Sequence, residues 1–342
     1  MMAEKKPKKN KYPVLWIIAG VLAVTGLLIA LLFVKGRMDM TSTGDVTVEA
    51  PKELQVAAEN NGRVVHYEDR TYYLNENITN ILCIGVDKHT LELQEQVGYG
   101  GQADSLFLAV LDSKNHTVSI IGLSRDSMTE VDVYDVEGNY VETVTEQLCL
   151  SYAYGDGMET SCENTVNSVS RMLYGIPIHG YVAIDMDCVS EINDLLGGVT
   201  IYPTEQDKKW FDFAMNKESV LLKGNEAELY IRFRDTDLLD SNNDRIRRQK
   251  TYLLAFIQKA LAETKADLTM PVRLLQKVEG DVVTNLSVSD ISYLASQVIN
   301  CEISMDDLTV VQGEIREEEG HAALYPDEQA LYELVLKTFY YQ

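Results

Sequence analysis

The longest run of apolar positions lies near the start of the chain. Pro13 to Val34 form a stretch of 22 residues without a charged side chain. A helix rises ~1.5 Å per residue, so this stretch would span about 33 Å, enough to cross the hydrocarbon core of a bilayer. We therefore predict one transmembrane helix over residues 13–34.

Basic residues on either side of this run indicate its orientation. Five lysines fall within residues 1–12, whereas Lys35 and Arg37 are the basic residues that follow closely. Because cytoplasmic flanks carry the excess of Lys and Arg, this predicts a cytoplasmic tail over residues 1–12 and an extracytoplasmic main domain. A cleaved signal peptide is the alternative, but the apolar run is long for one and no small-residue cleavage motif follows it. We expect a single-pass protein of the cell membrane.

The remainder of the chain divides into a linker and a folded part. Residues 35–62 are rich in Thr, Ser, Gly, Glu and Pro and show no sustained apolar period, as in a linker. From residue 63 the apolar period alternates between two and 3.6, which predicts an α/β fold with a mixed central sheet flanked by helices. One domain over residues 63–342 is expected, with a core at 63–265 and a C-terminal portion at 266–342. We expect strands at 63–66, 71–74, 80–86, 105–111, 117–124, 181–184, 199–202 and 308–311, and helices at 161–174, 188–196, from 245 onward, at 290–299 and within 325–341.

Two local patterns refine this picture. Thr160 and Glu163 have the spacing of a capping box, which predicts how the helix at 161–174 begins. Further along, a strand, a helix that is stopped by Gly197 and Gly198, and a second strand follow one another closely. This order predicts a compact βαβ-like unit.

Polar residues meet at one end of a predicted hairpin. The strands on either side of Lys114 and Asn115 pair antiparallel in this prediction, so that paired positions sum to 229 and Asp104 lies opposite Arg125. Their Cβ atoms would be ~5 Å apart. If the strand that ends at Asp87 is the antiparallel neighbour, a second carboxylate reaches the same edge. Two carboxylates and an arginine would then share one rim of the sheet.

The charge distribution suggests what this rim binds. The formal net charge is −23, yet six basic side chains fall within nineteen residues. A local reversal of sign in an acidic protein indicates an anionic partner, and the planar guanidinium group binds phosphate oxygens in pairs. Nucleic acid is a poor partner for the acidic remainder, so a small phosphate-rich ligand is expected. The six residues are Arg232, Arg234, Arg245, Arg247, Arg248 and Lys250.

The apolar period in two segments of this basic cluster would place polar side chains of each segment on one side. A period of two from Leu229 to Arg234 would place Arg232 and Arg234 on the same side of an extended segment. A helical pattern starts at Arg245, so Arg245 and Gln249 share one face near its N-terminus, where anions are favoured.

Purely structural interpretations of these residues stay open. Asp87, Asp104 and Arg125 have the composition of an ordinary strand-end ion-pair group, and such exposed pairs contribute little. The basic cluster would be a solvated helix face if its arginines pair with the acidic residues around it. Those candidates are Asp235, Asp237, Asp240 and Asp244.

Other chemistry has little support. The five histidines show no metal-ligand spacing and no nearby nucleophile partner. The five cysteines form no Cys-x-x-Cys pair, and we interpret them as mainly buried small hydrophobes. The glycines at positions 98, 100 and 101 lack the following helix of a nucleotide-binding loop, so they predict a mobile loop.

Five short motifs, in order, resemble the LytR-CpsA-Psr family over residues 63–265. Each motif is weak alone, and their order makes the set specific. They are Ile81 to Asp87 (ILCIGVD), Ala103-Asp104-Ser105, Ser124-Arg125-Asp126, Gly197-Gly198-Val199, and Arg232-Phe233-Arg234 followed by Arg245-Ile246-Arg247-Arg248-Gln249.

The resemblance implies a membrane-anchored extracytoplasmic phosphotransferase. Such an enzyme moves a glycopolymer, for example a teichoic acid or a capsular polysaccharide, from a polyprenyl-pyrophosphate carrier to peptidoglycan. Two departures from the family pattern are Gln102, where an arginine is usual, and Asn242, where an acidic residue is usual. The implied site residues are Asp87 and Asp104 for Mg²⁺ or Mn²⁺, and Arg125, Arg232, Arg234, Arg245 and Gln249 for the pyrophosphate.

The residue types agree with phosphoryl transfer, which depends mainly on in-line placement and on positive charge around the phosphoryl oxygens. Asp104 is favoured as a metal ligand, and the general base stays unassigned. Two other functions remain open. One is a non-catalytic envelope protein that binds polyprenyl phosphate or acts as a transcriptional attenuator, and the other is a polyprenyl pyrophosphatase.

Overall fold

The computed structural model describes residues 33–40, 48, 49, 51, 54, 56–233, 241–278, 280–301, 308–318 and 320–342, without the side chains of 241–244 and 246. The predicted transmembrane helix therefore lies outside the described residues except at its last two positions. Arg234 and most of the acidic candidates around the basic cluster also lie outside them. Within the described residues, no helix combines the length and the apolarity that crossing a bilayer requires.

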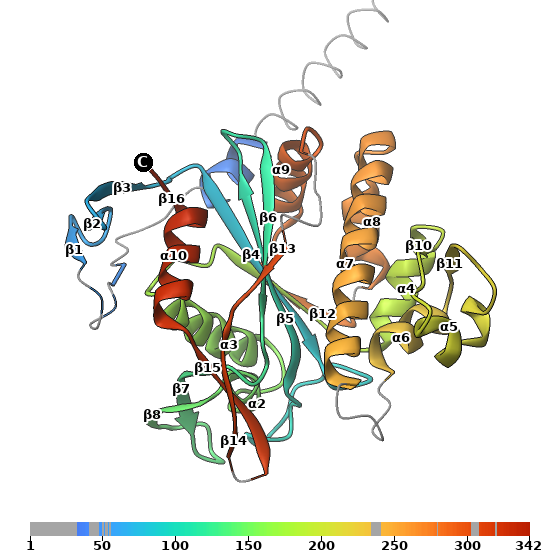
Figure 1. Cartoon of the computed structure of the whole chain (residues 1–342), viewed down its shortest axis with the longest axis horizontal. Coiled ribbons are helices and arrows are strands. Elements are labelled where there is room, and N and C mark those ends of the chain that lie inside the picture. Colours follow the sequence, from blue (N-terminus) through green and yellow to red (C-terminus); the bar gives the residue numbers. More distant parts are fainter. Residues whose placement is uncertain are drawn as a thin grey trace, which may run out of the picture.

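A mixed six-stranded sheet forms the centre of the molecule (Figure 1). Its strand order is β12-β9-β4-β5-β6-β13. The β4–β9 and β13–β6 pairs are parallel and the other three pairs are antiparallel, which confirms the predicted mixed sheet. The strands are β4 (Ile78–Val86), β5 (Ala103–Asp112), β6 (Thr117–Leu123), β9 (Gly180–Ile184), β12 (Val282–Thr284) and β13 (Leu308–Val310).

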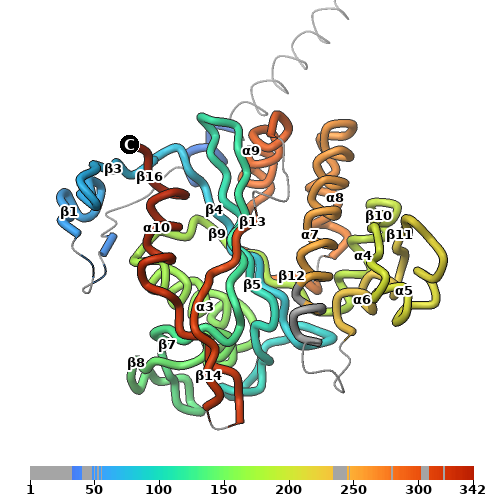
Figure 2. Tube along the Cα trace, in the orientation of Figure 1, coloured from blue at the N-terminus to red at the C-terminus, as the bar shows by residue number. Residues whose placement is uncertain are grey.

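Helices cover both faces of this sheet, because its strands carry apolar side chains on both sides (Figures 1 and 2). On one face, Leu82 and Leu108 belong to a core that includes Val169 of α3 (Glu159–Met172) and Val335 of α10 (Glu328–Phe339). On the other face, the core contains Ile120 and Leu308 together with buried Leu254 of α7 (Ser241–Ala266). Helix α9 (Val288–Val298) packs against this second core through Leu294 and Val298.

A smaller unit with its own core stands beside the sheet. It contains the antiparallel pair β10 (Val199–Ile201) and β11 (Val220–Leu222), and the helices α4 (Asp187–Leu195), α5 (Asp207–Trp210) and α6 (Asn225–Arg232), with the short helix η1 (Asp212–Ala214). The predicted βαβ-like unit is wrong, because β10 pairs with β11 and not within the sheet of β9. Gly197 and Gly198 both adopt positive φ, 79° and 99°, which turns the chain away after α4.

The predicted extended segment from Leu229 to Arg234 is also wrong in its described part. Leu229 to Arg232 form the end of α6, and the chain leaves the helix at Phe233. The buried residues are Ala227 and Tyr230, three positions apart, whereas Leu229 is 49% exposed. The period is therefore helical, and a window of six residues was too short to distinguish it from a period of two.

The start of α3 differs from the predicted capping box. The helix begins at Glu159, and Asp156 caps it, because its Oδ1 accepts hydrogen bonds from the backbone N–H groups of Met158 (2.8 Å) and Ser161 (3.2 Å). Thr160 donates its hydroxyl to the other oxygen of Asp156 at 2.9 Å. Asp156, four residues before Thr160, thus replaces the predicted pair.

Smaller elements surround this core. The strands predicted at 63–66 and 71–74 correspond to β2 and β3, which pair antiparallel, with Glu68 and Asp69 at positive φ in the turn between them. The prediction of a helix over 325–341 is correct only in its middle, because α10 is flanked by strands. The remaining elements are β1 (Ala57–Glu59), β2 (Val64–Tyr67), β3 (Arg70–Leu74), β7 (Met128–Tyr134), β8 (Tyr140–Gln147), α2 (Leu150–Ala153), α8 (Met270–Lys277), β14 (Gly313–Glu318), β15 (His321–Pro326) and β16 (Tyr340–Tyr341).

A short helix over residues 33–40 packs against the sheet domain. The Phe33 ring lies edge-on to Tyr293 of α9, with 5.4 Å between ring centroids. A Cβ atom at Gly36 would lie 2.3 Å from the backbone oxygen of Ser289, so only glycine fits this contact. The backbone oxygen of Met40 accepts a hydrogen bond from the hydroxyl of Thr79 at 3.1 Å. This helix is therefore part of the folded domain rather than of a linker.

Candidate active site

The β5–β6 hairpin has the register that the sequence predicts. Leu106 pairs with Leu123 and Asp112 with Thr117, so paired positions sum to 229. Two residues beyond the last pair, Asp104 and Arg125 form an ion pair. Both side chains are about 30% exposed. The structure thus places an arginine and a carboxylate together at the open end of the hairpin.

Asp87 reaches the same edge from β4. Strand β4 runs antiparallel to β5, with an irregularity in register between Gly85 and Val86. The backbone N–H of Asp87 donates to the carbonyl oxygen of Gln102 (3.1 Å), and the backbone N–H of Gln102 donates to Oδ1 of Asp87 (2.6 Å). This two-way contact holds an exposed carboxylate beside Asp104.

Glycine permits this close approach. Gly101 adopts a φ of +92°, and a Cβ atom there would lie 2.7 Å from Oδ1 of Asp87. Neighbouring Gly100 packs against Gly157. A Cβ atom at Gly100 would lie 2.5 Å from the Cα atom of Gly157. A hydrogen bond from the backbone N–H of Gly98 to the backbone oxygen of Ala153 (2.9 Å) adds a third attachment. The loop at residues 98–101, which was predicted to be mobile, is thus attached to the site and to the turn before α3.

Three further groups orient the Arg125 guanidinium. Its Nη2 donates to Oε1 of Gln102 at 2.8 Å and lies 3.6 Å from Sγ of Cys149. Its Nε lies 3.5 Å from Oδ1 of Asp126. Burial raises the pKa of Cys149 to about 11 even beside this cation, so its thiol stays neutral at physiological pH. Arg125 is therefore held in one orientation by side chains that surround it.

The electrostatics of Asp104 reveal another neighbour. Burial raises the pKa of the Asp104 carboxyl above its ordinary value, and the negative charge of Asp87 raises it further. The positive charges of Arg125 and Arg245 act in the opposite direction. Arg245, in the second turn of α7, therefore lies near enough to contribute to the field at Asp104.

The other predicted site residues have different positions. Arg232 forms an ion pair with Glu228 on its own helix, four residues earlier, and its side chain is 43% exposed. Gln249 lies one turn after Arg245 on α7 and is partly buried. Arg234 lies outside the described residues. The structure thus brings together Asp87, Asp104, Arg125 and Arg245. That Arg232 and Arg234 join this group stays a prediction.

Two arginines of the basic cluster serve the fold instead. Arg247 makes a two-point ion pair with the fully buried Asp207, at 2.7 and 3.1 Å. Arg248 is fully buried and lies over the ring of Trp210, 5.0 Å from its centroid, while its Nε donates to the backbone oxygen of Tyr230 at 2.8 Å. These contacts fasten α7 to the smaller unit. Arg248 is fully buried, whereas the Arg247 side chain is 33% exposed and has its charge paired with Asp207.

Sequence reasoning missed the contribution of Gln102 and Cys149. Gln102 connects Asp87 through its backbone and Arg125 through its side chain, so it links the carboxylate to the arginine. Gln102 precedes Asp104 by two residues, so the predicted position of Asp104 at the edge of the sheet could have indicated that Gln102 lies there too. Cys149 gave no such signal, because it enters the site from the start of α2, which no sequence pattern connects to the hairpin.

The carboxylates at this edge suit a hard divalent cation. Asp87 is exposed and accepts a hydrogen bond on Oδ1, while Asp104 lies beside it. Among the described residues, no group of three or more His, Cys, Asp or Glu side chains is arranged to hold a metal ion. A site with two carboxylates fits Mg²⁺, which keeps several waters and shares substrate phosphates rather than occupying a full protein cage.

Comparison with known proteins places this site in a family. A model of the LytR_cpsA_psr family matches residues 40–338. The chain belongs to the LytR-CpsA-Psr family. The resemblance in the five motifs is thereby confirmed, and the match extends well beyond residue 265 into the C-terminal portion.

Individual members of this family resemble the chain over most of its length. It is 25% identical over 296 residues to the polyisoprenyl-teichoic acid–peptidoglycan teichoic acid transferase TagU of Bacillus licheniformis, covering 85% of this chain and 83% of that protein. It is 28% identical over 233 residues to TagU of Bacillus cereus, covering 67% of each chain. A solved structure of TagT bound to LIIa-WTA aligns with a TM-score of 0.54 at 21% identity, covering 77% of this chain and 90% of that one. The last likeness establishes the fold.

Proposed function

We propose that this LytR-CpsA-Psr protein transfers a glycopolymer from a polyprenyl-pyrophosphate carrier to peptidoglycan. The observation that carries the proposal is the meeting of Asp87, Asp104, Arg125 and Arg245 at one edge of the sheet. TagU of two Bacillus species, which the chain resembles, is named as a transferase of teichoic acid from a polyisoprenyl carrier to peptidoglycan. A teichoic-acid-like polymer is therefore the substrate class that the relatives support.

The reaction exchanges the phosphoanhydride bond of the carrier for a phosphodiester bond to the acceptor. An acceptor hydroxyl oxygen attacks the phosphorus that carries the glycan, and the bond from this phosphorus to the bridging oxygen breaks. Polyprenyl phosphate leaves with the electron pair, and the hydroxyl proton passes to a base. Arg125 and Arg245 stabilise the charge that gathers on the phosphoryl oxygens. The carboxylates at the edge are the candidate proton acceptors, since burial raises the pKa of Asp104.

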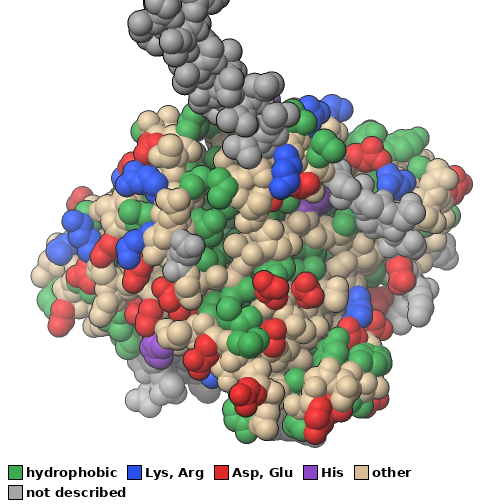
Figure 3. All heavy atoms as spheres, turned by 180° about the vertical axis from the view of Figure 1, so that it is seen from behind, with side chains coloured by type: hydrophobic (Ala, Val, Ile, Leu, Met, Phe, Trp, Pro, Cys, Tyr) green, Lys and Arg blue, Asp and Glu red, His purple; other side chains and the backbone are tan. Residues whose placement is uncertain are grey.

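We further propose that Asp87 and Asp104 hold Mg²⁺ or Mn²⁺. When bound, the cation would supply positive charge to the pyrophosphate oxygens. The net charge of the whole protein, −23, makes local positive charge necessary wherever an anionic substrate binds. Figure 3 shows acidic side chains spread over one face of the molecule. Anionic substrates thus depend on Arg125, Arg245 and a bound cation to offset the field of the remaining protein.

The proposed location follows from the N-terminal sequence. Residues 13–34 have the length and apolarity of a single membrane span, with the positive flank on the cytoplasmic side. The site would then lie outside the membrane, where a lipid carrier presents its glycan and where peptidoglycan is found. Membrane insertion can be measured directly by whether the protein stays in the membrane fraction after a carbonate wash, with a chain lacking residues 1–32 as the control.

The transfer itself is tested with the full chain in detergent micelles or vesicles. The assay contains a polyprenyl-pyrophosphate-linked glycan, peptidoglycan fragments and Mg²⁺, and mass spectrometry follows the joined product. We expect the wild type to form the conjugate and Asp104→Asn and Arg125→Ala to lose at least about a hundredfold in rate. The exposed-pair variant Arg273→Met is the matched control and should retain full activity.

The products distinguish the other functions. Release of polyprenyl phosphate and free glycan phosphate without a conjugate would identify a pyrophosphatase. Binding of the carrier with neither product would identify a non-catalytic binding protein. Either result from an intact wild-type protein would replace the transferase proposal.

A further inference from the structure

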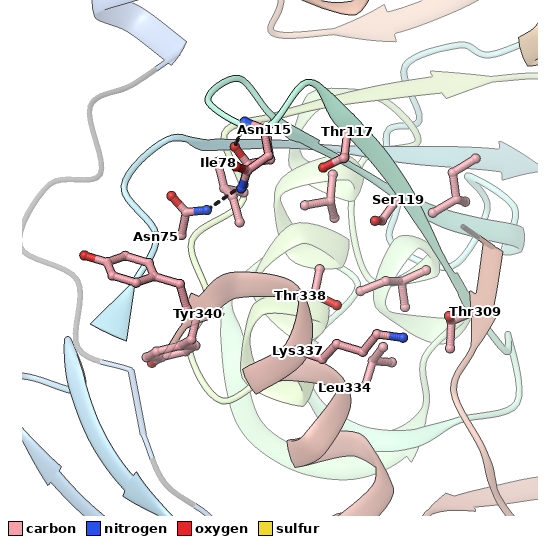
Figure 4. A pocket seen from close by; sticks show the side chains of 15 residues that line it. Asn75, Ile78, Asn115, Thr117, Ser119, Thr309, Leu334, Lys337, Thr338 and Tyr340 are labelled. Atoms are coloured by element: carbon pink, nitrogen blue, oxygen red, sulfur yellow. Dashed lines mark hydrogen bonds between the residues drawn. The ribbon is translucent and has the colours of Figure 1, made fainter. Parts of the chain in front are cut away.

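A polar cavity lies at the end of the β5–β6 hairpin opposite the candidate active site. It occupies about 260 Å³ between the sheet and helix α10 (Figure 4). Asp104 and Asp112 mark the two ends of β5, and eight residues at ~3.4 Å per residue separate them by about 27 Å. The cavity is therefore a separate site on the same hairpin.

Hydroxyl groups gather in this cavity from three different elements. Thr117 and Ser119 project from β6 on the side of the sheet that faces α10, and Thr309 joins them from neighbouring β13. Thr338 faces them from α10. Further inward, the same layer between sheet and helix is filled by leucine and valine. This change from apolar packing to hydroxyls leaves a hollow lined by groups that both donate and accept hydrogen bonds.

An ordered network of amides and one carboxylate closes one end of the cavity. Oδ2 of Asp112 accepts hydrogen bonds from Nδ2 of Asn75 (2.7 Å) and Nδ2 of Asn115 (2.8 Å). Its Oδ1 accepts the backbone N–H groups of Lys114 and Asn115, each at 2.9 Å. Figure 4 shows Asn75 and Asn115 joined at this end. The network fixes planar polar groups in place before any ligand arrives, which lowers the cost of ordering them.

A cation lies on the opposite wall. Lys337 projects from α10 toward Thr309 in Figure 4. Its side chain is exposed, and among the described residues no carboxylate forms an ion pair with its ammonium group. In a protein with a net charge of −23, a lysine with no such partner beside a row of hydroxyls is placed to receive an anionic group.

The hollow continues beyond this lysine. A second cavity of about 490 Å³ shares Lys337 and Tyr340 with the first, and Arg70 and Tyr72 contribute to its walls. Glu68 and Glu333 also line it, so the second cavity contains both signs of charge. Two adjoining hollows that share one wall suit a ligand made of linked units rather than a single small ion.

We propose that these cavities bind a saccharide chain whose units carry a carboxylate or a phosphate. Sugar hydroxyls would pair with the threonine and serine hydroxyls and with the Asn75–Asp112–Asn115 network. Apolar C–H faces of a sugar ring would lie on Ile78, Val110 and Leu334, which belong to the apolar part of the lining. The acidic group of the unit would pair with Lys337. Saccharides combine hydroxyls with apolar ring faces, and this lining combines the complementary groups.

This accessory site rests on the proposed function for its role, because it would hold a distant part of the same glycan substrate. A ligand attached at both places gains effective concentration at the reaction edge without any new contact there. Its binding, however, does not depend on transfer. The two proposals can therefore fail separately.

Direct binding tests the accessory site. Saturation-transfer NMR on the full chain in detergent micelles would compare glucuronic acid, glucose 1-phosphate and neutral glucose as probes. Inorganic phosphate, which has no carbon-bound proton to observe, would be titrated as a competitor that displaces the sugars. We expect both anionic sugars to bind more tightly than glucose and more tightly than phosphate. The tighter of the two identifies whether a uronate or a sugar phosphate is the natural group.

Two conservative variants locate the binding. Lys337→Met should weaken binding of the anionic sugars about tenfold while leaving glucose unchanged, because it removes the charge and keeps the length. Thr309→Val should weaken all three sugars, and it also serves if Lys337→Met fails to fold. Asp104→Asn, at the reaction edge, should leave these affinities unchanged even if it abolishes transfer.

Several results would overturn the proposal. One is the absence of binding by every sugar to a folded wild-type protein. Another is equal binding of inorganic phosphate and the anionic sugars, which would mean an anion site without saccharide recognition. A third is unchanged affinity in both Lys337→Met and Thr309→Val.

Discussion

Gln102 holds Arg125 in place, because its Oε1 accepts a hydrogen bond from Nη2 of the guanidinium at 2.8 Å. The backbone N–H of Gln102 also donates a hydrogen bond to Oδ1 of Asp87, and this contact does not depend on the side chain at position 102. We predict that Gln102→Leu lowers kcat for transfer about tenfold, since one hydrogen bond that orients a charged group is lost. Steady-state kinetics of glycan transfer would measure this.

A second glutamine in the same loop provides the control. Gln94 is bonded through its side chain to Glu92 and contacts neither Arg125 nor Asp87. Gln94→Leu should therefore keep normal kinetics. Equal losses in both variants would mean that loop disturbance, rather than orientation of Arg125, causes the effect.

The two strained glycines of this loop offer a sharper comparison. Gly101→Ala would bring a Cβ atom to 2.7 Å from Oδ1 of Asp87, whereas Gly98→Ala meets nothing within 4 Å. Both residues have φ above +90°, so both substitutions carry a similar backbone cost of about 1 kcal/mol. We predict that Gly101→Ala alone loses most of its activity, and that both variants lose similar stability in urea unfolding. Comparable activity in the two would show that the position of Asp87 does not matter for transfer.

Arg247 should be important for stability rather than for catalysis. Its removal leaves Asp207, which is fully buried, without its two-point partner and with Arg248 4.0 Å away. We predict that Arg247→Met lowers the free energy of unfolding by about 3 kcal/mol, as is typical when one partner of a buried ion pair is removed. The exposed pair of Arg273 with Asp267 is the control, and Arg273→Met should cost less than about 1 kcal/mol.

The double variant Arg247→Met with Asp207→Asn completes this test. It removes the buried charge together with its partner, so it should recover part of the stability. If it unfolds as easily as the single variant, the loss comes from packing of the arginine side chain rather than from an uncompensated charge.

His179 should make stability depend on pH. Burial lowers its pKa to about 4, whereas an unfolded histidine titrates near 6.5. The folded protein therefore binds fewer protons than the unfolded chain between these values, and stability falls as the pH drops below 6.5. The slope is at most ~1.4 kcal/mol per pH unit. Urea unfolding of the wild type at pH 7.5, 6 and 5 would measure it.

Substitution separates this histidine from other titrating groups. His179→Gln should flatten the decline between pH 7.5 and 5, even though it loses the hydrogen bond from the Asn80 N–H to Nδ1. His321 lies exposed on β15, and His321→Gln should leave the decline unchanged. An unaltered slope in His179→Gln would assign the pH dependence to other groups.

Much of the site could be predicted from the sequence because it depends on strand register. Two hydrophobic runs around Lys114 fix the pairing of β5 with β6, and this pairing alone places Asp104 opposite Arg125. Both faces of these strands are apolar, so the short turn around Lys114 and Asn115, rather than exposure of one face, fixes the register. The position of Asp87 follows from the same logic on β4.

Predictions failed where short segments carry ambiguous patterns. The segment that ends at Arg232 is helical, because Ala227 and Tyr230 are the residues it buries against the smaller core. Sequence alone did not reveal that core, since Gly197 and Gly198 divert the chain from the main sheet. The partners of Arg247 and Arg248 were missed for the same reason, because Asp207 and Trp210 belong to that unit.

The packing of residues 33–40 against α9 connects the proposed membrane anchor to the candidate active site. Thr79, which bonds to Met40, stands at the start of β4, and Asp87 follows its far end, so about 27 Å of strand separates them. If the proposed span over residues 13–34 is present, the contact of Gly36 with Ser289 holds the end of this anchor near the start of β4, and the candidate active site lies at the far end of that strand. A lipid carrier would then have to bring its pyrophosphate to that far end.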